Sequence, residues 1–174
     1  RIAPAVAKAA MDSGVATRPI ADLKAYAEKL TEFVYKTSLF MRPVFNQARK
    51  EIKRIVLTEG EDERVLHAAQ HVASHKLAFP ILVGDGKLIE ERIAVQGLTI
   101  QAGKDYELID IKNNPHYEES WKAYYSLRKR QGVTEEMARR RLKANSTLVG
   151  ALMVKLGHAD GLVCGTMGRF HDHF

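Results

Sequence analysis

The sequence predicts an α/β protein, a three-layer α/β/α arrangement around a mostly parallel sheet, preceded by a helical linker. Three observations support this fold class. Short apolar runs alternate with longer helical patterns beyond residue 53, which is typical of a parallel sheet covered on both faces. The repeating patterns before that point are helical only. The 174 residues are enough for one compact domain with an appendage, and too few for two full α/β domains.

Helical patterns account for the region before residue 53. We expect three helices there: at 4–13, from Asp22 onward, and near 38–50. Pro4 suits a first helical turn, and Gly14 stands where a C-terminal cap is expected. Pro43 should mark the start of the third helix or a kink in it, because proline removes a backbone donor. The polar, charged segment 46–53 is the expected boundary before the sheet.

Short apolar runs and helical patterns alternate in the rest of the chain. Strands are expected at 55–58, 79–83, 106–111 and 160–164. Helices are expected between them, at 62–75, 86–95, 114–130, 134–143 and 145–157. Turn and cap residues such as Gly84, Gly86 and Thr134 separate these elements. The order of the strands in the sheet does not follow from alternation alone.

The composition limits the classes of partner. The formal net charge is +6, but the basic residues are dispersed, and the groups at 128–130 and 139–143 are interpreted as solvated helix faces. No aromatic residues are interleaved for stacking, so nucleic acid is not an expected partner, whereas anionic small molecules suit the charge. The sequence has no run of 18 apolar residues and no signal-peptide pattern, and its single Cys164 fits a reducing compartment. We therefore expect a cytoplasmic protein without a membrane partner.

The turn after the first expected strand, residues 58–64 (TEGEDER), is rich in acids. Loops at the carboxyl ends of parallel strands line the ligand crevice of an open sheet. The acids after Gly60 are interpreted as the start of a helix, where negative charge is favourable. Arg64 either pairs with Glu59 or Glu61 to hold the loop, or meets an anion. We expect Glu59, Gly60 and Arg64 to be structural or to lie at the rim of a pocket.

The segment after the last expected strand contains two glycines and a threonine. Gly165, Thr166 and Gly168 form a turn of the kind that brings backbone N–H groups close to a phosphate. We therefore take these three residues, together with Arg64, as candidates for an anion-binding cleft. The sequence has no Walker loop and no Gly-x-Gly-x-x-Gly fingerprint.

Other reactive side chains lie near the end of the chain. His171, Asp172 and His173, with His158, have a composition that suits a metal, but polar residues at a domain edge or lining a pocket are the favoured interpretation. Cys164 is disfavoured as a nucleophile, because a strand end is buried and no activating partner is evident. No residue is assigned as a catalytic residue or as a metal ligand.

Three stretches resemble the phosphotransacetylase domain: RIVLTEGEDERVLHAA, NPHYEESWKAYYSLRKRQGVTEEMARRRL and VGALMVKLGHADGLVCG. The resemblance runs from about residue 53 to residue 174 and implies a fold like that of phosphotransacetylases and isocitrate dehydrogenases. The first stretch of the chain, RIAPAVAKAAMDSGVATRPIADLKAYAEKL, is similar to the closing segment of the nicotinamide-binding domain of bacterial malic enzymes. In this order the two resemble the hybrid NADP-dependent malic enzymes of bacteria.

This resemblance implies three parts: the end of a malic-enzyme NAD(P)-binding domain at 1–20, a helical linker at 21–52, and an incomplete phosphotransacetylase-like domain at 53–174. We expect a fragment of a longer polypeptide. The whole protein would oxidatively decarboxylate malate to pyruvate, using NADP and a divalent cation, Mg or Mn, held in upstream domains. The residues that catalyse either family's reaction have no match in this chain, so no catalytic residue is implied.

The resemblance also implies acetyl-CoA as an effector. We expect self-association into a homo-oligomer, because the missing second half of the domain would leave apolar surface exposed. Cys164-Gly165-Thr166 stands where true phosphotransacetylases begin with Ser-Gly-Ala, and residues 168–173 replace a hydroxyl-bearing run, which argues against acyl-phosphate chemistry. We therefore expect an acetyl-CoA-responsive regulatory and oligomerisation domain without its own catalysis. An active phosphate acetyltransferase domain and a purely structural oligomerisation module are the alternatives.

Overall fold

The protein, represented by a computed structural model, is described for residues 2–173. It consists of two compact units, Arg1–Gln47 and Ala48–Phe174. None of the helices within residues 2–173 is both long and apolar enough to cross a membrane.

The first unit is helical, as expected. Its elements are α1 (Ile2–Asp12) and α2 (Leu23–Lys50), the second of which runs on past the unit boundary. Gly14 follows α1 with a φ of +74°, and the N–H of Val15 donates to the carbonyl of Ala10 at 3.1 Å, which confirms the expected glycine cap. Asp22 accepts two backbone N–H groups of the first turn of α2, at 2.8 and 3.0 Å, and so caps that helix.

The expectation of a separate helix near 38–50 is wrong. Leu23–Lys50 is one helix of 28 residues with Pro43 inside it. A proline removes one intrahelical hydrogen bond and disfavours helix at the residue before it. Alanine, arginine and lysine occur on both sides of Pro43, and the helix preference of the flanking residues outweighs the loss of that single bond.

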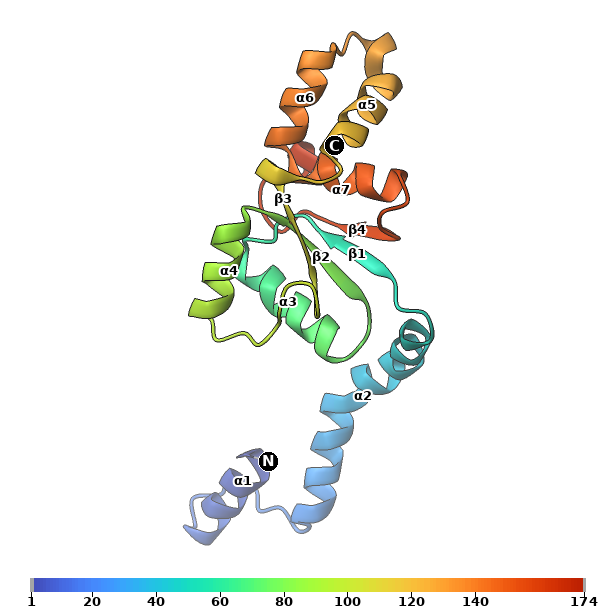
Figure 1. Ribbon diagram of the computed structural model, residues 1–174. Coiled ribbons are helices and arrows are strands. Elements are labelled where there is room, and N and C mark those ends of the chain that lie inside the picture. The colour runs from blue at the N-terminus through green and yellow to red at the C-terminus, as the bar shows by residue number, and fades with distance from the viewer. Residues whose placement is uncertain (1, 174) are drawn as a thin grey trace. The chain divides into compact units, whose positions relative to one another are not determined.

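Within residues 48–173, four strands form one parallel sheet: β1 (Arg54–Leu57), β2 (Phe79–Gly84), β3 (Glu107–Asp110) and β4 (Gly161–Val163). Each agrees with its expected range to within one residue at either end. The spatial order is β3-β2-β1-β4, so the last strand returns across the sheet to pair with the first (Figure 1). Ile55 is paired with Pro80 on one side and with Gly161 on the other.

Helices cover both faces of this sheet (Figure 1). Those in residues 48–173 are α3 (Glu63–Ser74), α4 (Gly86–Val95), α5 (Tyr117–Arg128), α6 (Glu135–Ala144) and α7 (Ser146–Lys155). Strand β2 divides its side chains between the two faces, because successive residues of a strand point in opposite directions. Leu82 packs with α3 and α4, whereas Ile81 and Val83 pack with α5, α6 and α7. The predicted three-layer α/β/α arrangement is therefore confirmed.

The helix expected at 114–130 begins later, at Tyr117. Asn114 precedes Pro115 and is extended, with φ −71° and ψ 119°, as steric contact with a following proline favours. The remaining expected helices of this unit agree with the structure to within two residues at either end. Short 3-10 turns complete the described chain: η1 (Ile111–Asn113), η2 (Lys129–Gln131) and η3 (Phe170–His173).

Candidate functional site

A hollow of about 360 Å³ lies at the carboxyl ends of β1 and β2, where the sequence predicts a ligand crevice. We call it the strand-end crevice. The turn after β1, the first residue of α7 and the segment after β4 all contribute to it. Its lining includes Glu59, Gly60, Glu61, Ser146, Gly168 and His173.

Glu59 connects the turn after β1 with the segment after β4. Its Oε1 accepts the backbone N–H of Gly165 at 2.8 Å, and its Oε2 accepts the hydroxyl of Thr58 at 2.9 Å. Nδ1 of His173 lies 3.7 Å from Oε1. The Glu59 side chain is only 10% exposed, so these donors replace the water that its carboxylate would otherwise bind. Glu59 is therefore a structural residue at the crevice.

A second carboxylate holds the other end of the same strand pair. Asp160, just before β4, accepts the backbone N–H of Arg54 at 2.7 Å, and its own N–H donates to the Arg54 carbonyl at 2.8 Å. Glu59 stands just after β1 and binds the backbone beyond β4. The short pairing of β1 with β4 thus has a carboxylate at each end. Each carboxylate binds a backbone N–H on the opposite side of the pairing.

His173 is fixed by neighbours on three sides. Its Nε2 lies 2.7 Å from the carbonyl oxygen of Met167, and a carbonyl only accepts, so this nitrogen carries a proton. In the neutral ring Nδ1 is then an acceptor for the hydroxyl of Thr147, at 2.9 Å. The side chain is 11% exposed. This histidine therefore ties η3 to the first turn of α7.

Arg64 pairs with a carboxylate that the sequence analysis did not select. Its guanidinium makes two bonds to Asp62, of 3.0 and 2.9 Å, and a third to the carbonyl of Thr166, of 3.0 Å. The expected partners Glu59 and Glu61 bind elsewhere, the latter to the N–H of Asp85 at 2.8 Å. The Arg64 guanidinium holds the pKa of Asp62 below its ordinary value. Because Arg64 is 70% exposed, the pair stabilises the fold only weakly.

Gly60 is needed for close packing. It lies in a tight turn, which the N–H of Asp62 closes by donating to the carbonyl of Glu59 at 2.9 Å, and its φ is not positive. A Cβ at this position would lie 3.0 Å from both Ile89 Cδ1 and the Val83 carbonyl oxygen. The N–H of Gly60 donates to that same carbonyl at 3.1 Å. The turn after β1 thus lies directly against β2.

The four residues proposed for an anion cleft lie together at the ends of β1 and β4, but most of their polar groups are engaged. The N–H of Gly165 binds Glu59, and Arg64 binds both Asp62 and the carbonyl of Thr166. Gly168 lines the crevice. Two carboxylates, Glu59 and Glu61, line it as well, and negative charge there disfavours a phosphate.

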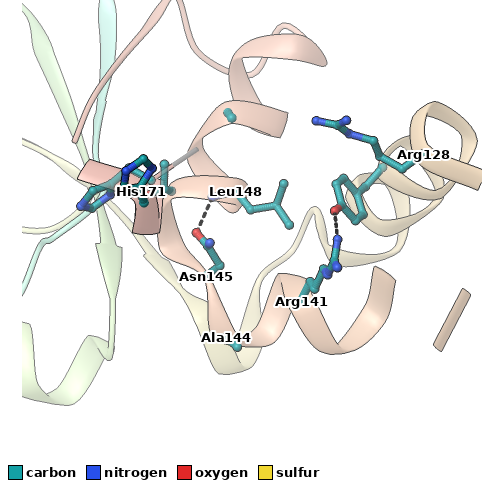
Figure 2. Close-up of a pocket in the computed structure, with 10 residues that line it drawn as sticks. Arg128, Arg141, Ala144, Asn145, Leu148 and His171 are labelled. Carbon is teal, nitrogen blue, oxygen red and sulfur yellow. Dashed lines mark hydrogen bonds between the residues drawn. The ribbon is translucent and has the colours of Figure 1, made fainter. Parts of the chain in front are cut away.

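A second and larger hollow, of about 610 Å³, lies between α5, α6, α7 and η3. We call it the basic hollow, and Figure 2 shows residues that line it, among them Arg128, Arg141, Asn145, Leu148 and His171. Arg141 Nη1 donates to the hydroxyl of Tyr124 at 2.7 Å, and Arg128 Nη1 donates to Gln131 Oε1 at 2.6 Å. Among the side chains that the structure describes, neither arginine forms an ion pair with a carboxylate.

Sequence reasoning missed this hollow. Arg128 and Arg141 belong to the two basic groups that were interpreted as solvated helix faces. They are exposed, but they come from different helices and line the same hollow with Tyr124. The two arginines come together because of how α5 and α6 pack. The residue pattern within either helix does not reveal that packing.

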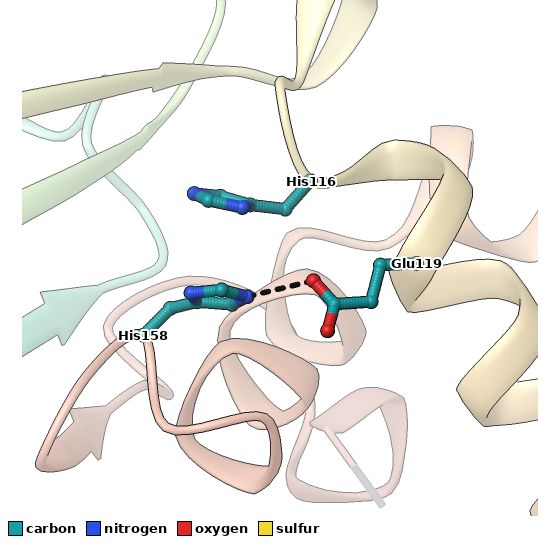
Figure 3. A group of neighbouring side chains, drawn as sticks. All are labelled: His116, Glu119 and His158. Atoms are coloured by element: carbon teal, nitrogen blue, oxygen red, sulfur yellow. Dashed lines mark hydrogen bonds and ion pairs between the residues drawn. The ribbon is translucent and has the colours of Figure 1, made fainter.

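A third group of polar side chains is formed by His116, Glu119 and His158 (Figure 3). The grouping of His158 with His171 and His173 in one metal-binding set is not what the structure shows. His158 follows α7 and lies next to Glu119, whereas His173 lies next to Glu59. His158 and His173 are apart because α7 begins at the strand-end crevice and leads back to the amino end of β4, where His158 lies.

Cys164 follows β4 and is partly buried. Burial raises the pKa of its thiol, and the nearby negative charge of Glu59 raises it further. The reactive thiolate is therefore scarce at neutral pH, which disfavours a nucleophilic role.

The chain matches the family described as Phosphate acetyl/butaryl transferase over residues 39–174. It is 57% identical over 174 residues to an NADP-dependent malic enzyme of Salmonella typhimurium, covering 100% of this chain and 23% of that protein. A phosphate acetyltransferase of Synechocystis sp. is 36% identical over 129 residues, covering 74% of this chain and 18% of that protein. The chain thus spans about a quarter of the length of the malic enzyme it resembles.

A solved structure shares the fold. The phosphotransacetylase from Streptococcus pyogenes superposes with a TM-score of 0.67 at 28% identity, covering 76% of this chain and 40% of that chain. The α/β fold described above therefore matches that of phosphotransacetylases.

Proposed function

This chain belongs to the phosphate acetyl/butaryl transferase family, and on that premise we propose that it is the regulatory, phosphotransacetylase-like part of an NADP-dependent malic enzyme. The observation that carries the proposal is the extent of the similarity. Similarity to a malic enzyme covers all 174 residues, whereas similarity to a phosphate acetyltransferase covers 129. The whole protein would oxidise and decarboxylate malate to pyruvate in the cytoplasm, with NADP and Mg or Mn bound outside this chain.

The bonding at the strand-end crevice supports a role without catalysis. Gly165 and Thr166 use their backbone groups to hold the segment after β4 against Glu59 and Arg64. The thiol of Cys164 has a raised pKa. None of these groups is arranged as a nucleophile with a base beside it.

Acetyl-CoA is the proposed effector, and the basic hollow is the better of the two candidate sites for its phosphates. Arginine is well suited to phosphate, since its planar guanidinium donates several hydrogen bonds at once. Arg128 and Arg141 line the basic hollow, whereas Glu59 and Glu61 line the strand-end crevice. The volume of about 610 Å³ falls in the range of small-molecule sites.

An effector assay on the full-length protein tests this proposal. NADPH production from malate is followed while acetyl-CoA is titrated. We expect a saturable change of rate, since an effector that prefers one conformation shifts the population. A flat response would contradict regulation by acetyl-CoA.

A matched pair of variants then locates the site. Arg141→Ala should weaken the acetyl-CoA response about 10- to 100-fold, as expected for the loss of hydrogen bonds to a charged group. Arg140→Ala removes the same charge one residue away, where the side chain is exposed and reaches Glu136 at 3.5 Å. It should leave the response unchanged. Equal effects of the two variants would rule out a specific role for the basic hollow.

A phosphate acetyltransferase is the second candidate, favoured by the 36% identity to such an enzyme. Formation of acetyl phosphate from acetyl-CoA by the full-length protein would support it. A structural, oligomer-forming role is the third. Val163 on the edge strand β4 is 56% exposed, which suits contact with another chain. Sedimentation of the full-length protein measures that association directly.

A further inference from the structure

We propose that His116, Glu119 and His158 bind a zinc ion, which joins the start of α5 to the segment before β4. This inference concerns residues that the regulatory function does not use, and it stands or falls independently of that function. The site lies apart from the strand-end crevice and the basic hollow, neither of which these residues line.

The three side chains face one another. Nε2 of His158 and Oε2 of Glu119 are 3.0 Å apart. Each of the three residues offers one ligand atom, and these atoms all lie within 4.8 Å of one another. Figure 3 shows the Glu119 carboxylate directed at the edge of the His158 ring, with the His116 ring above it. Chain segments about 40 residues apart thus bring two imidazoles and a carboxylate to one point.

The distances are close to those of a zinc site. Bonds of about 2.0–2.1 Å in a tetrahedral arrangement place neighbouring ligand atoms about 3.3 Å apart. The Glu119–His158 pair, at 3.0 Å, is close to this separation, and all three ligand atoms lie within 4.8 Å of one another. The rings of His116 and His158 are stacked, with centroids 3.9 Å apart and planes at 24°. The site would close around the ion when the His116 side chain rotates away from the His158 ring.

The backbone at His116 and Glu119 is fixed. His116 immediately precedes α5 and Glu119 lies in its first turn, so both ligands come from the start of one helix. Asn114 accepts the N–H of His116 at 2.8 Å, and the His116 carbonyl accepts the N–H of Ser120 at 2.9 Å.

The backbone at His158 is fixed as well. Gly157 ends α7 with a φ of +82°, and the N–H of His158 donates to the carbonyl of Met153 at 2.8 Å. Ligands carried on well-ordered backbone lose little entropy when the ion binds.

The chemistry of the group selects the ion. Two imidazoles and one carboxylate are a known zinc ligand set, with a fourth position left for water. Calcium and magnesium favour oxygen ligands, of which this group supplies few.

A surface histidine pair in the same chain supplies the control. His71 lies in the last turn of α3 and His75 caps its end, with ring centroids 4.1 Å apart, and both are exposed. Such a pair can also attract a transition metal. His71→Ala therefore removes the alternative site and leaves the proposed site intact.

Calorimetry with Zn²⁺ tests the proposal on the full chain after treatment with a chelator. We expect one equivalent to bind tightly, in addition to any that occupies the divalent-cation site outside this chain, and to raise the melting temperature, since a ligand of the folded state stabilises it. Glu119→Gln should weaken this binding more than about 10-fold, and His158→Ala likewise. His71→Ala should retain it. Absence of tight binding, or its loss in His71→Ala alone, would overturn the proposal.

Glu119→Gln decides the outcome even where His158→Ala fails to fold. Glu119 is exposed, and glutamine keeps its size and its helix preference, so the variant should fold normally. Co²⁺ serves as a spectroscopic probe of the same variant, because its visible absorption reports coordination by protein ligands. Equal Zn²⁺ affinity and equal Co²⁺ spectra for the wild type and Glu119→Gln would rule out the site.

Discussion

The strand-end crevice and the basic hollow use their polar groups in opposite ways. At the crevice, Glu59 and His173 are almost completely buried, and each is bonded to other parts of the chain. At the basic hollow, Arg128 and Arg141 are exposed and bonded to neutral partners, Gln131 and Tyr124. The comparison indicates that the position expected to bind a ligand mainly holds the fold together, whereas positive charge is available elsewhere.

The largest effect is expected when the buried carboxylate is removed. Glu59→Ala leaves the N–H of Gly165 and the hydroxyl of Thr58 without their acceptor, and His173 without its neighbouring charge. We expect the free energy of unfolding to fall by about 2–4 kcal/mol, which is roughly 6–12 °C in melting temperature. Denaturant and thermal unfolding measure it.

The basic hollow provides the matching variant for that experiment. Arg141→Ala should change the free energy of unfolding by less than about 0.5 kcal/mol, because the side chain is exposed. Equal losses of stability in Glu59→Ala and Arg141→Ala would show that the two regions do not differ in the way described.

A smaller effect is expected for the hydroxyl that faces His173. Thr147→Val keeps the shape of the side chain but removes the donor to Nδ1, 2.9 Å away. The loss of this bond should cost about 1 kcal/mol of unfolding free energy. Thr166→Val is the control, since the described bond of Thr166 is through its backbone carbonyl. A neutral Thr147→Val would mean that His173 is held without this bond.

The smallest effect concerns the exposed pair at the rim of the crevice. The guanidinium of Arg64 lowers the pKa of Asp62 from its ordinary 3.8. A carboxyl whose folded pKa is depressed adds stability above its unfolded pKa, and that stability is lost as the pH falls through the folded value. Arg64→Ala should therefore raise the pKa of Asp62 and reduce stability slightly at neutral pH, but not at the lowest pH. Titration followed by NMR tests this, and an unchanged pKa would exclude the pairing.

Much of the fold could be predicted because its causes are local. Asp62, Asp85, Thr134 and Asn145 each cap the helix that follows, and these residues are visible in the sequence. The errors have local causes too, since Pro43 was given too much weight and Pro115 too little. Strand order could not be predicted, because the pairing of β1 with β4 depends on the path of everything between them.

The site was harder to predict, because its bonds join distant residues. Glu59 was expected at a pocket rim, yet its acceptor role depends on Gly165, 106 positions later. Helix packing brings Arg128 close to Arg141, and His116 close to His158. The periodicity of the sequence does not predict that packing. Sequence reasoning identified the right edge of the sheet, but it could not select the partners.

The two carboxylates that close the pairing of β1 with β4 have a consequence for how the second unit folds. Arg54 with Asp160 and Glu59 with Gly165 are each 106 residues apart, so both contacts form only after a long loop has closed. We expect contacts of this separation to slow folding and to form after β1 and β2 have paired through a much shorter connection. Because β4 has three residues and one strand neighbour among the described residues, it is also the part of the sheet that opens most readily. We therefore expect the acids at its two ends to slow the separation of β4 from β1.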